Sequence, residues 1–298
     1  MTSSVEPDGF DYQGMVIRPP SEADSILIQA TLGCSHNKCS FCGTYRGKRF
    51  AIKDEEIVAR DLAFARKYCR RQDKLFLMDG DALIIPQERL VRLLEKIREM
   101  LPWVRRVGAY ANSKSIKMKS DEELARLREL GLGILYYGVE SGDDVTLDRI
   151  NKGADSDRLL TQGLRARRAG FKLSVTVLLG IGGRERSREH ARATGELLTK
   201  MDPDFVGALT VMVIPGTRLA EEQAAGTWTL PGQMEILREL REMVAATRLT
   251  RGMFFSNHAS NYLALKIRYP HGQVEALGVI DLALSGKVGL KPEWMRAL

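Results

Sequence analysis

The stretch GCSHNKCSFC, residues 33–42, places three of the chain's four cysteines within nine residues. It follows an apolar run at residues 25–31, so we expect a polar loop directly after the first strand. A disulfide framework would spread its cysteines along the chain, whereas thiols gathered on one short loop are typical of a metal site. The stretch therefore predicts a metal centre with Cys34, Cys39 and Cys42 as ligands.

The number of thiols favours one kind of centre. Three thiolates on a short loop can hold three irons of a [4Fe–4S] cubane and leave the fourth iron open. A structural zinc site, the alternative, usually has four ligands in two separated pairs. The remaining cysteine, Cys69, falls on the apolar stripe of an expected helix, where we interpret it as a small buried hydrophobic residue.

Apolar runs alternate with helix-period segments from about residue 25 to residue 217. The runs cover residues 25–31, 74–78, 106–111, 133–138, 172–180 and 205–214. Each contains consecutive apolar residues, as expected for parallel strands covered on both faces. Six β/α units in a row predict an α/β fold, either a wound parallel sheet or an open barrel, and we expect a partial (β/α)6 TIM-type barrel. Catalytic groups gather at the carboxyl ends of such strands.

The pattern changes after Thr217. We expect a helix that carries Ile236 and Leu240, a strand-like run at residues 253–255 and a last helix at residues 274–284. The chain thus divides into an N-terminal segment (residues 1–24), a core (25–217) and a C-terminal α/β extension (218–298). We predict that the extension packs on the barrel and closes its substrate side.

Composition places the chain in the ordinary globular class, with 44% hydrophobic and 28% charged residues. The net charge of +7 comes from interleaved charges and indicates a mixed solvated surface, with a phosphorylated metabolite or nucleic acid as the alternative. Residues 1–10 lack the basic and apolar regions of a secretion signal, and no apolar run approaches the roughly 20 residues of a membrane span. We expect a cytoplasmic protein with no membrane partner.

The cysteine stretch resembles the signature of the radical S-adenosylmethionine (SAM) superfamily. The usual spacing is three and then two intervening residues, whereas here it is four and two, as in some branches. Phe41 matches the aromatic residue that members place before the third cysteine, where the backbone meets the adenine of SAM. The resemblance implies an oxygen-sensitive [4Fe–4S] cluster whose open iron binds SAM. It also implies reductive cleavage to a 5′-deoxyadenosyl radical, with electrons from a partner such as flavodoxin or ferredoxin.

A second match follows the second strand, at Asp79-Gly80-Asp81. It resembles the Gly-Gly-Glu-Pro signature, whose acidic residue accepts hydrogen bonds from the methionine ammonium of SAM. The resemblance makes Gly80 and Asp81 candidate SAM contacts. Asp81 is one methylene shorter than the usual glutamate, so a backbone carbonyl shares the task as one alternative. A helix N-cap acid before Pro86 is the other.

A third match is the run YGVESG, residues 137–142, after the fourth strand. It resembles the Gly-Val-Glu-Ser-Gly run of the methylthiotransferase-like branch. In oxygen-independent coproporphyrinogen oxidases, the polar residue at this place contacts the ribose of SAM, and a cation twelve positions later contacts its carboxylate. These positions are Glu140 and Lys152. A lysine on a solvated helix end is the alternative for Lys152, with Arg149 as the next candidate.

Two further matches concern the adenine. The run TVLLGIGG, residues 176–183, resembles the family's adenine-contacting strand. Leu178 is the candidate apolar contact, and Thr176 the candidate for the ribose hydroxyls. The run VIPGT, residues 213–217, resembles the segment whose backbone pairs with the adenine edge, which makes Ile214 a candidate; a simple strand-ending turn is the alternative.

The resemblance covers roughly residues 16 to 217 and points to the core shared by methylthiotransferases, elongator proteins and coproporphyrinogen oxidases. Small, functionally unassigned superfamily members of about this length are also similar. In the extension, residues 255–262 are densely polar, and we expect Asn257 and His258 to contact the substrate or, equally, to join a buried polar network. The basic loop at residues 46–49 is an alternative anion contact, interpreted mainly as solvated.

The function predicted is a radical SAM enzyme that acts on a small molecule. The sequence has no second cysteine set, no cobalamin domain before the barrel and no nucleic-acid-binding module after it. Two alternatives remain. RNA modification is allowed by the net charge and would show a steep inverse salt dependence. An iron–sulfur electron carrier would leave Asp81, Glu140 and Lys152 unexplained.

Overall fold

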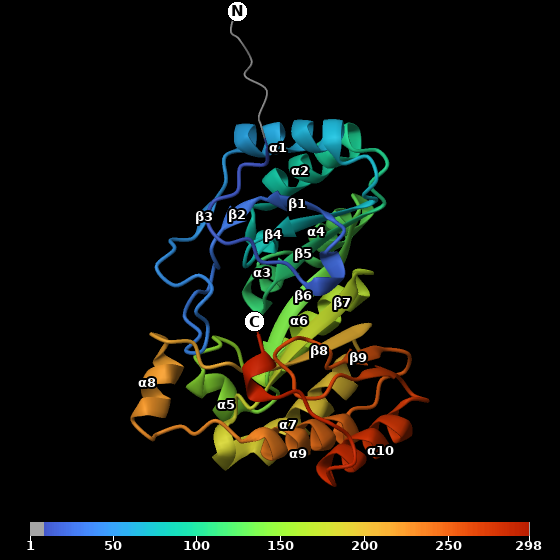
Figure 1. Cartoon of the computed structure of the whole chain (residues 1–298). Helices are drawn as coiled ribbons and strands as arrows, with labels where there is room; N and C mark the ends of the chain where they lie inside the picture. Colours follow the sequence, from blue (N-terminus) through green and yellow to red (C-terminus); the bar gives the residue numbers. More distant parts are fainter. Residues whose placement is uncertain (1–8, 298) are drawn as a thin grey trace, which may run out of the picture. The chain divides into compact units, whose positions relative to one another are not determined.

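The computed structural model describes residues 9–297, which divide into two compact units. Unit 1 runs to Asn37 and includes Tyr45–Tyr136 and Arg165–Lys172; unit 2 comprises Lys38–Thr44, Tyr137–Leu164 and the chain from Leu173 onward. Strand β6 (Leu132–Glu140) therefore passes from one unit to the other (Figure 1). The division also falls within the cysteine loop, with Cys34 in unit 1 and both Cys39 and Cys42 in unit 2.

Unit 1 contains parallel strands. Their order is β1 (Ile26–Gln29), β4 (Lys74–Met78), β5 (Arg106–Ala111) and the first part of β6. The β1–β4 and β4–β5 pairs are parallel, while the short pair β2 (Thr31–Leu32) and β3 (Ala51–Ile52) is antiparallel. The last four residues of β4 are fully buried, as the uninterrupted apolar run predicts for a strand covered on both faces.

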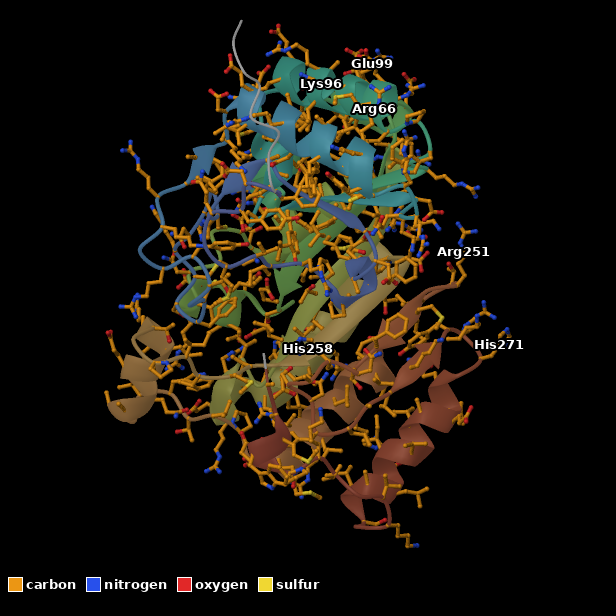
Figure 2. The ribbon with its side chains drawn as sticks, turned by 45° about the horizontal axis from the view of Figure 1, so that its top comes forward. Arg66, Lys96, Glu99, Arg251, His258 and His271 are labelled. Atoms are coloured by element: carbon orange, nitrogen blue, oxygen red, sulfur yellow. The ribbon has the colours of Figure 1, made fainter. Side chains whose placement is uncertain are left out.

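In the sequence, the helices of unit 1 lie between these strands. They are α1 (Glu55–Tyr68), α2 (Gln87–Met100), α3 (Ser113–Lys117) and α4 (Asp121–Glu129), with short 3-10 turns η1 (Pro20–Glu22) and η2 (Ala82–Ile84). Both α1 and α2 bury the apolar stripes predicted from the helix period. Their outer faces are charged: Arg66, Lys96 and Glu99 are exposed (Figure 2). This agrees with the mixed-charge surface expected from the composition.

Unit 2 continues with the same pattern and then departs from it. Its strand order is the rest of β6, β7 (Lys172–Leu179), β8 (Phe205–Thr210), β9 (Met253–Phe255) and β10 (Lys266–Arg268). Its helices are α5 (Asp144–Arg149), α6 (Ser156–Arg168), α7 (Gly183–Met201), α8 (Arg218–Ala224), α9 (Gln233–Ala246), α10 (Gln273–Leu284) and η3 (Glu293–Met295). Strands β7, β8 and β9 are parallel, and β10 is antiparallel to β9. Helix α7 packs on α9, and α9 on α10.

The structure corrects several details. The strand expected over residues 205–214 ends at Thr210, because the chain turns away before Pro215. Cys69 is the C-cap residue of α1 and is half-buried, so its assignment to the buried stripe was wrong. Helices α3, α5 and α8 and strand β10 were not predicted, since each is too short to show a clear period. Among residues 9–297, no helix is both long and apolar enough to cross a membrane.

The close packing of α7 on α9 yields a stability prediction. A Cβ added to Gly195 would lie 2.6 Å from the Cβ of Ala246 and 2.8 Å from the carbonyl oxygen of Met243. Gly195→Ala should therefore lower the free energy of unfolding by about 1–3 kcal/mol, measured by urea denaturation. Gly278 lies in α10 with open space around its Cα. Gly278→Ala should raise stability by about 0.5–1 kcal/mol, and a loss there would contradict this packing account.

Candidate SAM and cluster site

In unit 1, Cys34 lies directly against the loop after β4. The Gly33 amide donates to Asp79 Oδ2 at 3.3 Å, and the Gly80 amide donates to the carbonyl oxygen of Gly33 at 3.0 Å. A Cβ on Gly80 would lie 2.7 Å from the Cβ of Cys34. Glycine is therefore required at position 80, because any side chain there would push the first cysteine of the loop away.

Asp81 follows and is completely buried. Its Oδ2 accepts hydrogen bonds from Ser35 Oγ at 2.5 Å and from Asn112 Nδ2 at 2.7 Å. Its Oδ1 is buried and has no hydrogen-bond partner among the described residues. Burial raises the pKa of Asp81 to about 6, although bonds from Ser35, Ser115 and Asn112 oppose the shift. A buried oxygen of this kind is ready to accept a charge-assisted bond from an ammonium group.

The alternative of a helix N-cap for Asp81 is wrong. Asp81 stands at the N-cap position of η2, but its side chain makes no capping hydrogen bond. Asn112 was missed by the sequence analysis. Its Oδ1 caps α3 by accepting from the amides of Lys114 and Ser115, which leaves its Nδ2 directed at Asp81. The signal was present: a polar residue directly after a buried strand, at the edge where catalytic groups gather.

In unit 2, the part of the loop that carries Cys39 and Cys42 is anchored through its backbone. The Ser40 amide donates to the carbonyl of Ile150 at 2.9 Å, and its carbonyl accepts from the Leu219 amide at 3.0 Å. Asn151 Nδ2, next along from Ile150, donates to the carbonyl of Lys38 at 3.1 Å. The loop thus rests on the end of α5 and the start of α8.

The residue after the third cysteine makes another close contact. A Cβ on Gly43 would lie 2.7 Å from Cγ2 of Ile214. Ile214, half-buried, therefore lies directly beside the cysteine loop, as expected for a motif that shares its ligand. Phe41 is also half-buried.

Glu140 and Lys152 are brought together as an ion pair. Lys152 Nζ donates to Glu140 Oε1 at 2.9 Å, and each side chain is 11% exposed. Glu140 ends β6 with a φ of +68°, a left-handed conformation that is rare outside glycine. A Cβ on Gly138 would meet Glu140 Oε1 at 2.5 Å. The two predicted SAM contacts thus share one small space, which only a glycine at position 138 leaves open.

Thr176 and Leu178 lie on the same face of β7, since alternate residues of a strand point to one side. Thr176 is half-buried and Leu178 is 8% exposed, whereas Val177 and Leu179 on the other face are at most 1% exposed. The face expected to meet the nucleoside is therefore the more accessible of the two.

The residues of the polar run in the extension differ in how deeply they are buried. Asn257 is exposed, and His258 is half-buried with Nδ1 2.9 Å from Ser260 Oγ (Figure 2). Burial and the charge of Lys291 lower the pKa of His258. The buried part comes next: Asn261 Nδ2 donates to the carbonyl of Ala208 in β8 at 2.8 Å. A structural network is therefore present in this run, centred on Ser260 and Asn261.

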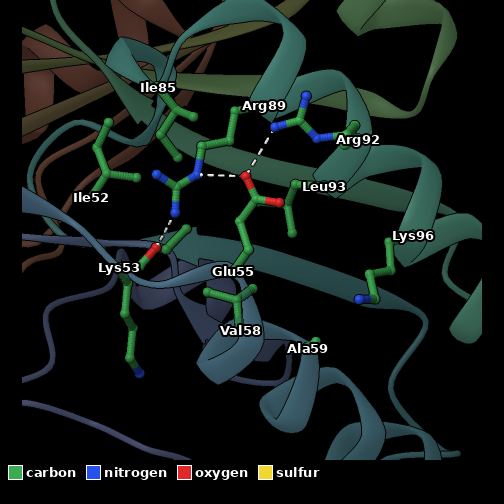
Figure 3. Close-up of a pocket in the computed structure, with 11 residues that line it drawn as sticks. Ile52, Lys53, Glu55, Val58, Ala59, Ile85, Arg89, Arg92, Leu93 and Lys96 are labelled. Carbon is green, nitrogen blue, oxygen red and sulfur yellow. Dashed lines mark hydrogen bonds and ion pairs between the residues drawn. The ribbon is translucent and has the colours of Figure 1, made fainter.

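A separate pocket lies in unit 1 between α1, α2 and β3 (Figure 3). It has a volume of about 170 Å³, and none of the predicted site residues lines it. Glu55 pairs with both Arg89 and Arg92 at 3.0 Å, and Lys53 pairs with Asp61 at 3.2 Å. In the basic loop after the cysteines, Arg46 and Arg49 are exposed, whereas Nζ of Lys48 is buried and has no hydrogen-bond partner among the described residues.

The donor set fits an iron–sulfur cluster. Cys34, Cys39 and Cys42 form no disulfide, and each is partly exposed. Within residues 9–297, no three His, Cys, Asp or Glu side chains are already gathered as a metal-binding group. Three thiols on one short loop suit a cubane with an open iron better than a closed zinc site, which usually has four ligands in two separated pairs.

Known proteins resemble this chain over its larger part. The heme chaperone HemW of Bacillus subtilis is 24% identical over 180 residues, covering 60% of this chain and 47% of that protein. A biotin synthase of Myxococcus xanthus is 24% identical over 253 residues, covering 81% and 68%. Coproporphyrinogen III oxidase (HemN) from Escherichia coli superposes with a TM-score of 0.55 at 18% identity, covering 74% and 51%. The chain spans about half the length of the first curated relatives it matches.

The strands are mostly parallel, and the likeness to HemN confirms the expected α/β partial barrel fold. The family model described as the radical SAM superfamily matches residues 28–198. The chain belongs to the radical SAM superfamily. Its cofactors are accordingly a [4Fe–4S] cluster and SAM, and enzymes of this family require a reductant and a substrate.

Two fully buried titratable groups yield a pH prediction. His190 (α7) and Glu239 (α9) lie 3.5 Å apart. Burial lowers the pKa of His190 from 6.5 to about 4 and raises that of Glu239 from 4.5 to about 7. Between pH 4.5 and 6.5, folding therefore removes a proton from the histidine and adds one to the glutamate. The pair contributes no net slope to stability in this window.

Single variants should expose slopes of opposite sign. In Glu239→Gln the opposing contribution of the glutamate is removed, so stability relative to wild type should rise with pH from about 4.5 to 7. In His190→Asn the contribution of the histidine is removed, so stability relative to wild type should fall as pH rises from about 4 to 6.5. Each slope reaches at most about 1.4 kcal/mol per pH unit, measured by urea unfolding at several pH values. If the free energy of unfolding of both variants changed with pH in the same direction relative to wild type, the assigned protonation states would be contradicted.

Proposed function

We propose that this protein binds a [4Fe–4S] cluster through Cys34, Cys39 and Cys42 and cleaves SAM reductively to generate a radical on a small-molecule substrate. The observation that carries the proposal is the anchoring of the cysteine loop in each unit. Its first part rests on Gly80 and Asp81, and its second on residues 150–151 and Ile214. These are the segments that the resemblance associates with SAM.

The residues of the site take distinct tasks in this proposal. Asp81 accepts from the methionine ammonium through its free, buried Oδ1. Lys152 binds the methionine carboxylate while Glu140, its ion-pair partner, accepts from the ribose hydroxyls. Thr176 and Leu178 face the nucleoside from β7. Phe41 and the backbone at Ile214 flank the adenine. When bound, the reduced cluster supplies the electron that breaks the sulfur–carbon bond of SAM.

The proposed substrate is a small molecule held on the side of the C-terminal residues. Biotin synthase, among the relatives named here, has a small-molecule product by its name, and this chain covers 68% of its length. We assign residues 218–298 to this side, with Asn257 and His258 as candidate contacts, beyond an N-terminal segment (1–24) and a core (25–217). A flavodoxin or ferredoxin fits as electron donor. RNA as substrate would appear as binding that weakens steeply with salt, because each phosphate contact releases counterions.

The assignment of three cysteine ligands predicts which variants lose the cluster. Anaerobically reconstituted protein should show the brown absorbance of a cubane near about 400 nm and form 5′-deoxyadenosine with dithionite and SAM. Cys34→Ala, Cys39→Ala and Cys42→Ala should abolish both, because each removes one of only three ligands. Cys69→Ala is the matched control and should retain both. Equal iron loss in the Cys69 variant would overturn the three-ligand assignment.

The SAM contacts predict a second pattern. Asp81→Asn keeps a hydrogen-bonding side chain for Ser35 and Asn112 but removes the charge, and Lys152→Met keeps the stem and removes the ammonium. Each should weaken SAM binding by about 1–3 kcal/mol at unchanged iron content, measured by titration calorimetry. Asp24→Asn and Lys200→Met change exposed residues and serve as controls. Wild-type affinity in Lys152→Met would place the carboxylate contact elsewhere, with Arg149 next.

A further inference from the structure

His190 and Glu239 are buried beneath the strand ends that face SAM in the proposal above. Both side chains are 0% exposed, on α7 and α9 of unit 2. A polar group without solvent is stable only if its hydrogen bonds are satisfied within the protein. The partners of these two residues therefore show what the pair holds in place.

The imidazole of His190 joins two segments. Nε2 lies 3.0 Å from the carbonyl oxygen of Leu178 in β7, and Nδ1 lies 2.7 Å from Ser141 Oγ, just after β6. A carbonyl only accepts, so Nε2 carries the proton and Nδ1 accepts from the serine hydroxyl. The pKa of His190, lowered by burial to about 4, agrees with a neutral ring. Ser141 Oγ in turn accepts from the Asp143 amide at 3.0 Å, which completes its bonding.

The carboxyl group of Glu239 holds the next part of the same strand. Oε1 accepts from the Gly180 amide at 2.5 Å, and Oε2 accepts from Ser187 Oγ at 2.5 Å. The histidine thus holds the carbonyl of residue 178 and the glutamate holds the amide of residue 180. Gly180 has a φ of +84°, so the backbone turns sharply at this point. Together the two side chains define where β7 ends and in which direction the chain leaves it.

Helix α7 fixes the other segment as well. The Gly142 amide donates to Thr194 Oγ1 at 2.9 Å, and a Cβ on Gly142 would collide with the carbonyl oxygen of Ala193. Residues 140–142 therefore rest on the same helix that carries His190. One buried cluster sets the position of both segments assigned to the nucleoside of SAM: Glu140 at the end of β6 and Leu178 in β7.

We propose that His190 and Glu239 are positioning residues for SAM, which hold Glu140–Gly142 and Leu178–Gly180 in the binding geometry before SAM arrives. The proposal rests on the proposed function. A preformed site binds more tightly because less backbone must be ordered on binding. It also gives a role to α9: this helix of the C-terminal extension supports the cofactor site of the core.

Substituting His190 by glutamine or by asparagine keeps one of its two hydrogen bonds and removes the other. His190→Gln places an amide N–H near the carbonyl of Leu178 and gives up the Ser141 bond, whereas His190→Asn does the reverse. Each should raise the Kd for SAM about tenfold in the cluster-loaded full-length protein, with unchanged iron content. Amide hydrogen exchange without SAM should quicken at residues 141–142 in the first variant and at residues 178–180 in the second.

The conservative variant of Glu239 should retain SAM binding. In Glu239→Gln the amide oxygen still accepts from Gly180, and the amide nitrogen donates to Ser187 Oγ, so SAM affinity should stay within about twofold of wild type. Glu239→Ala loses both bonds and should bind SAM about tenfold more weakly. Gly195→Ala disturbs the same helix pair without removing a bond of the cluster, so its SAM affinity per folded molecule should equal that of wild type.

The possible results distinguish the positioning role of His190 and Glu239 from the proposed function on which it rests. Wild-type SAM affinity and unchanged exchange in both His190 variants, while the wild-type protein forms 5′-deoxyadenosine, would overturn the positioning role alone. Weakened SAM binding in Gly195→Ala equal to that of His190→Gln would also overturn it, because instability would then account for both. A wild-type protein that loads a cluster yet neither binds nor cleaves SAM would overturn both proposals.

Discussion

Close approach of neighbouring residues to glycines is the constraint on which the proposed site depends. Gly80 admits Cys34 in unit 1, and Gly43 admits Ile214 in unit 2, each at a distance that leaves no room for a Cβ. Gly138 does the same for the pair of Glu140 and Lys152. At each of these points the missing side chain lets a neighbouring residue approach the backbone closely.

A second feature of the structure is the burial of ionisable groups. Asp81, His190 and Glu239 are all fully buried, and burial shifts the pKa of each toward its neutral form. Such groups are costly unless bonded, so they persist where their bonds order a neighbouring segment. His190 and Glu239 satisfy nearly all their bonding inside the fold. Asp81 keeps one oxygen without a partner among the described residues, as expected of a group that awaits a ligand.

The backbone itself carries strain at the same places. Asp79 and Glu140, each at the end of a parallel strand, adopt φ values of +71° and +68°. For residues other than glycine this conformation is unfavourable by about 1–2 kcal/mol and persists where the surroundings demand it. Both directly border residues assigned to SAM. Strain, buried charge and close backbone contact thus occur at the carboxyl ends of β4 and β6.

The sequence by itself determined the fold class, the superfamily and the main strands. Strands β4 and β5 lie within the predicted bounds, because an uninterrupted apolar run between loops has few other ways to be buried. The cysteine spacing and the strand-end motifs identified the cofactors, since ligand chemistry depends on local residue types. Short helices such as α3 and α5 escaped prediction because one or two turns show no period.

Only the tertiary structure decided which polar residues meet. Asn112 reaches Asp81 from 31 positions along the chain, and His190 joins Ser141 to Leu178 across α7. Ser260 and Asn261 form the buried part of the network in the polar run, and the half-buried His258 joins it through Ser260. Periodicity predicts which face of an element is buried, but the partner of a buried polar atom depends on how distant elements pack, and no local pattern records that.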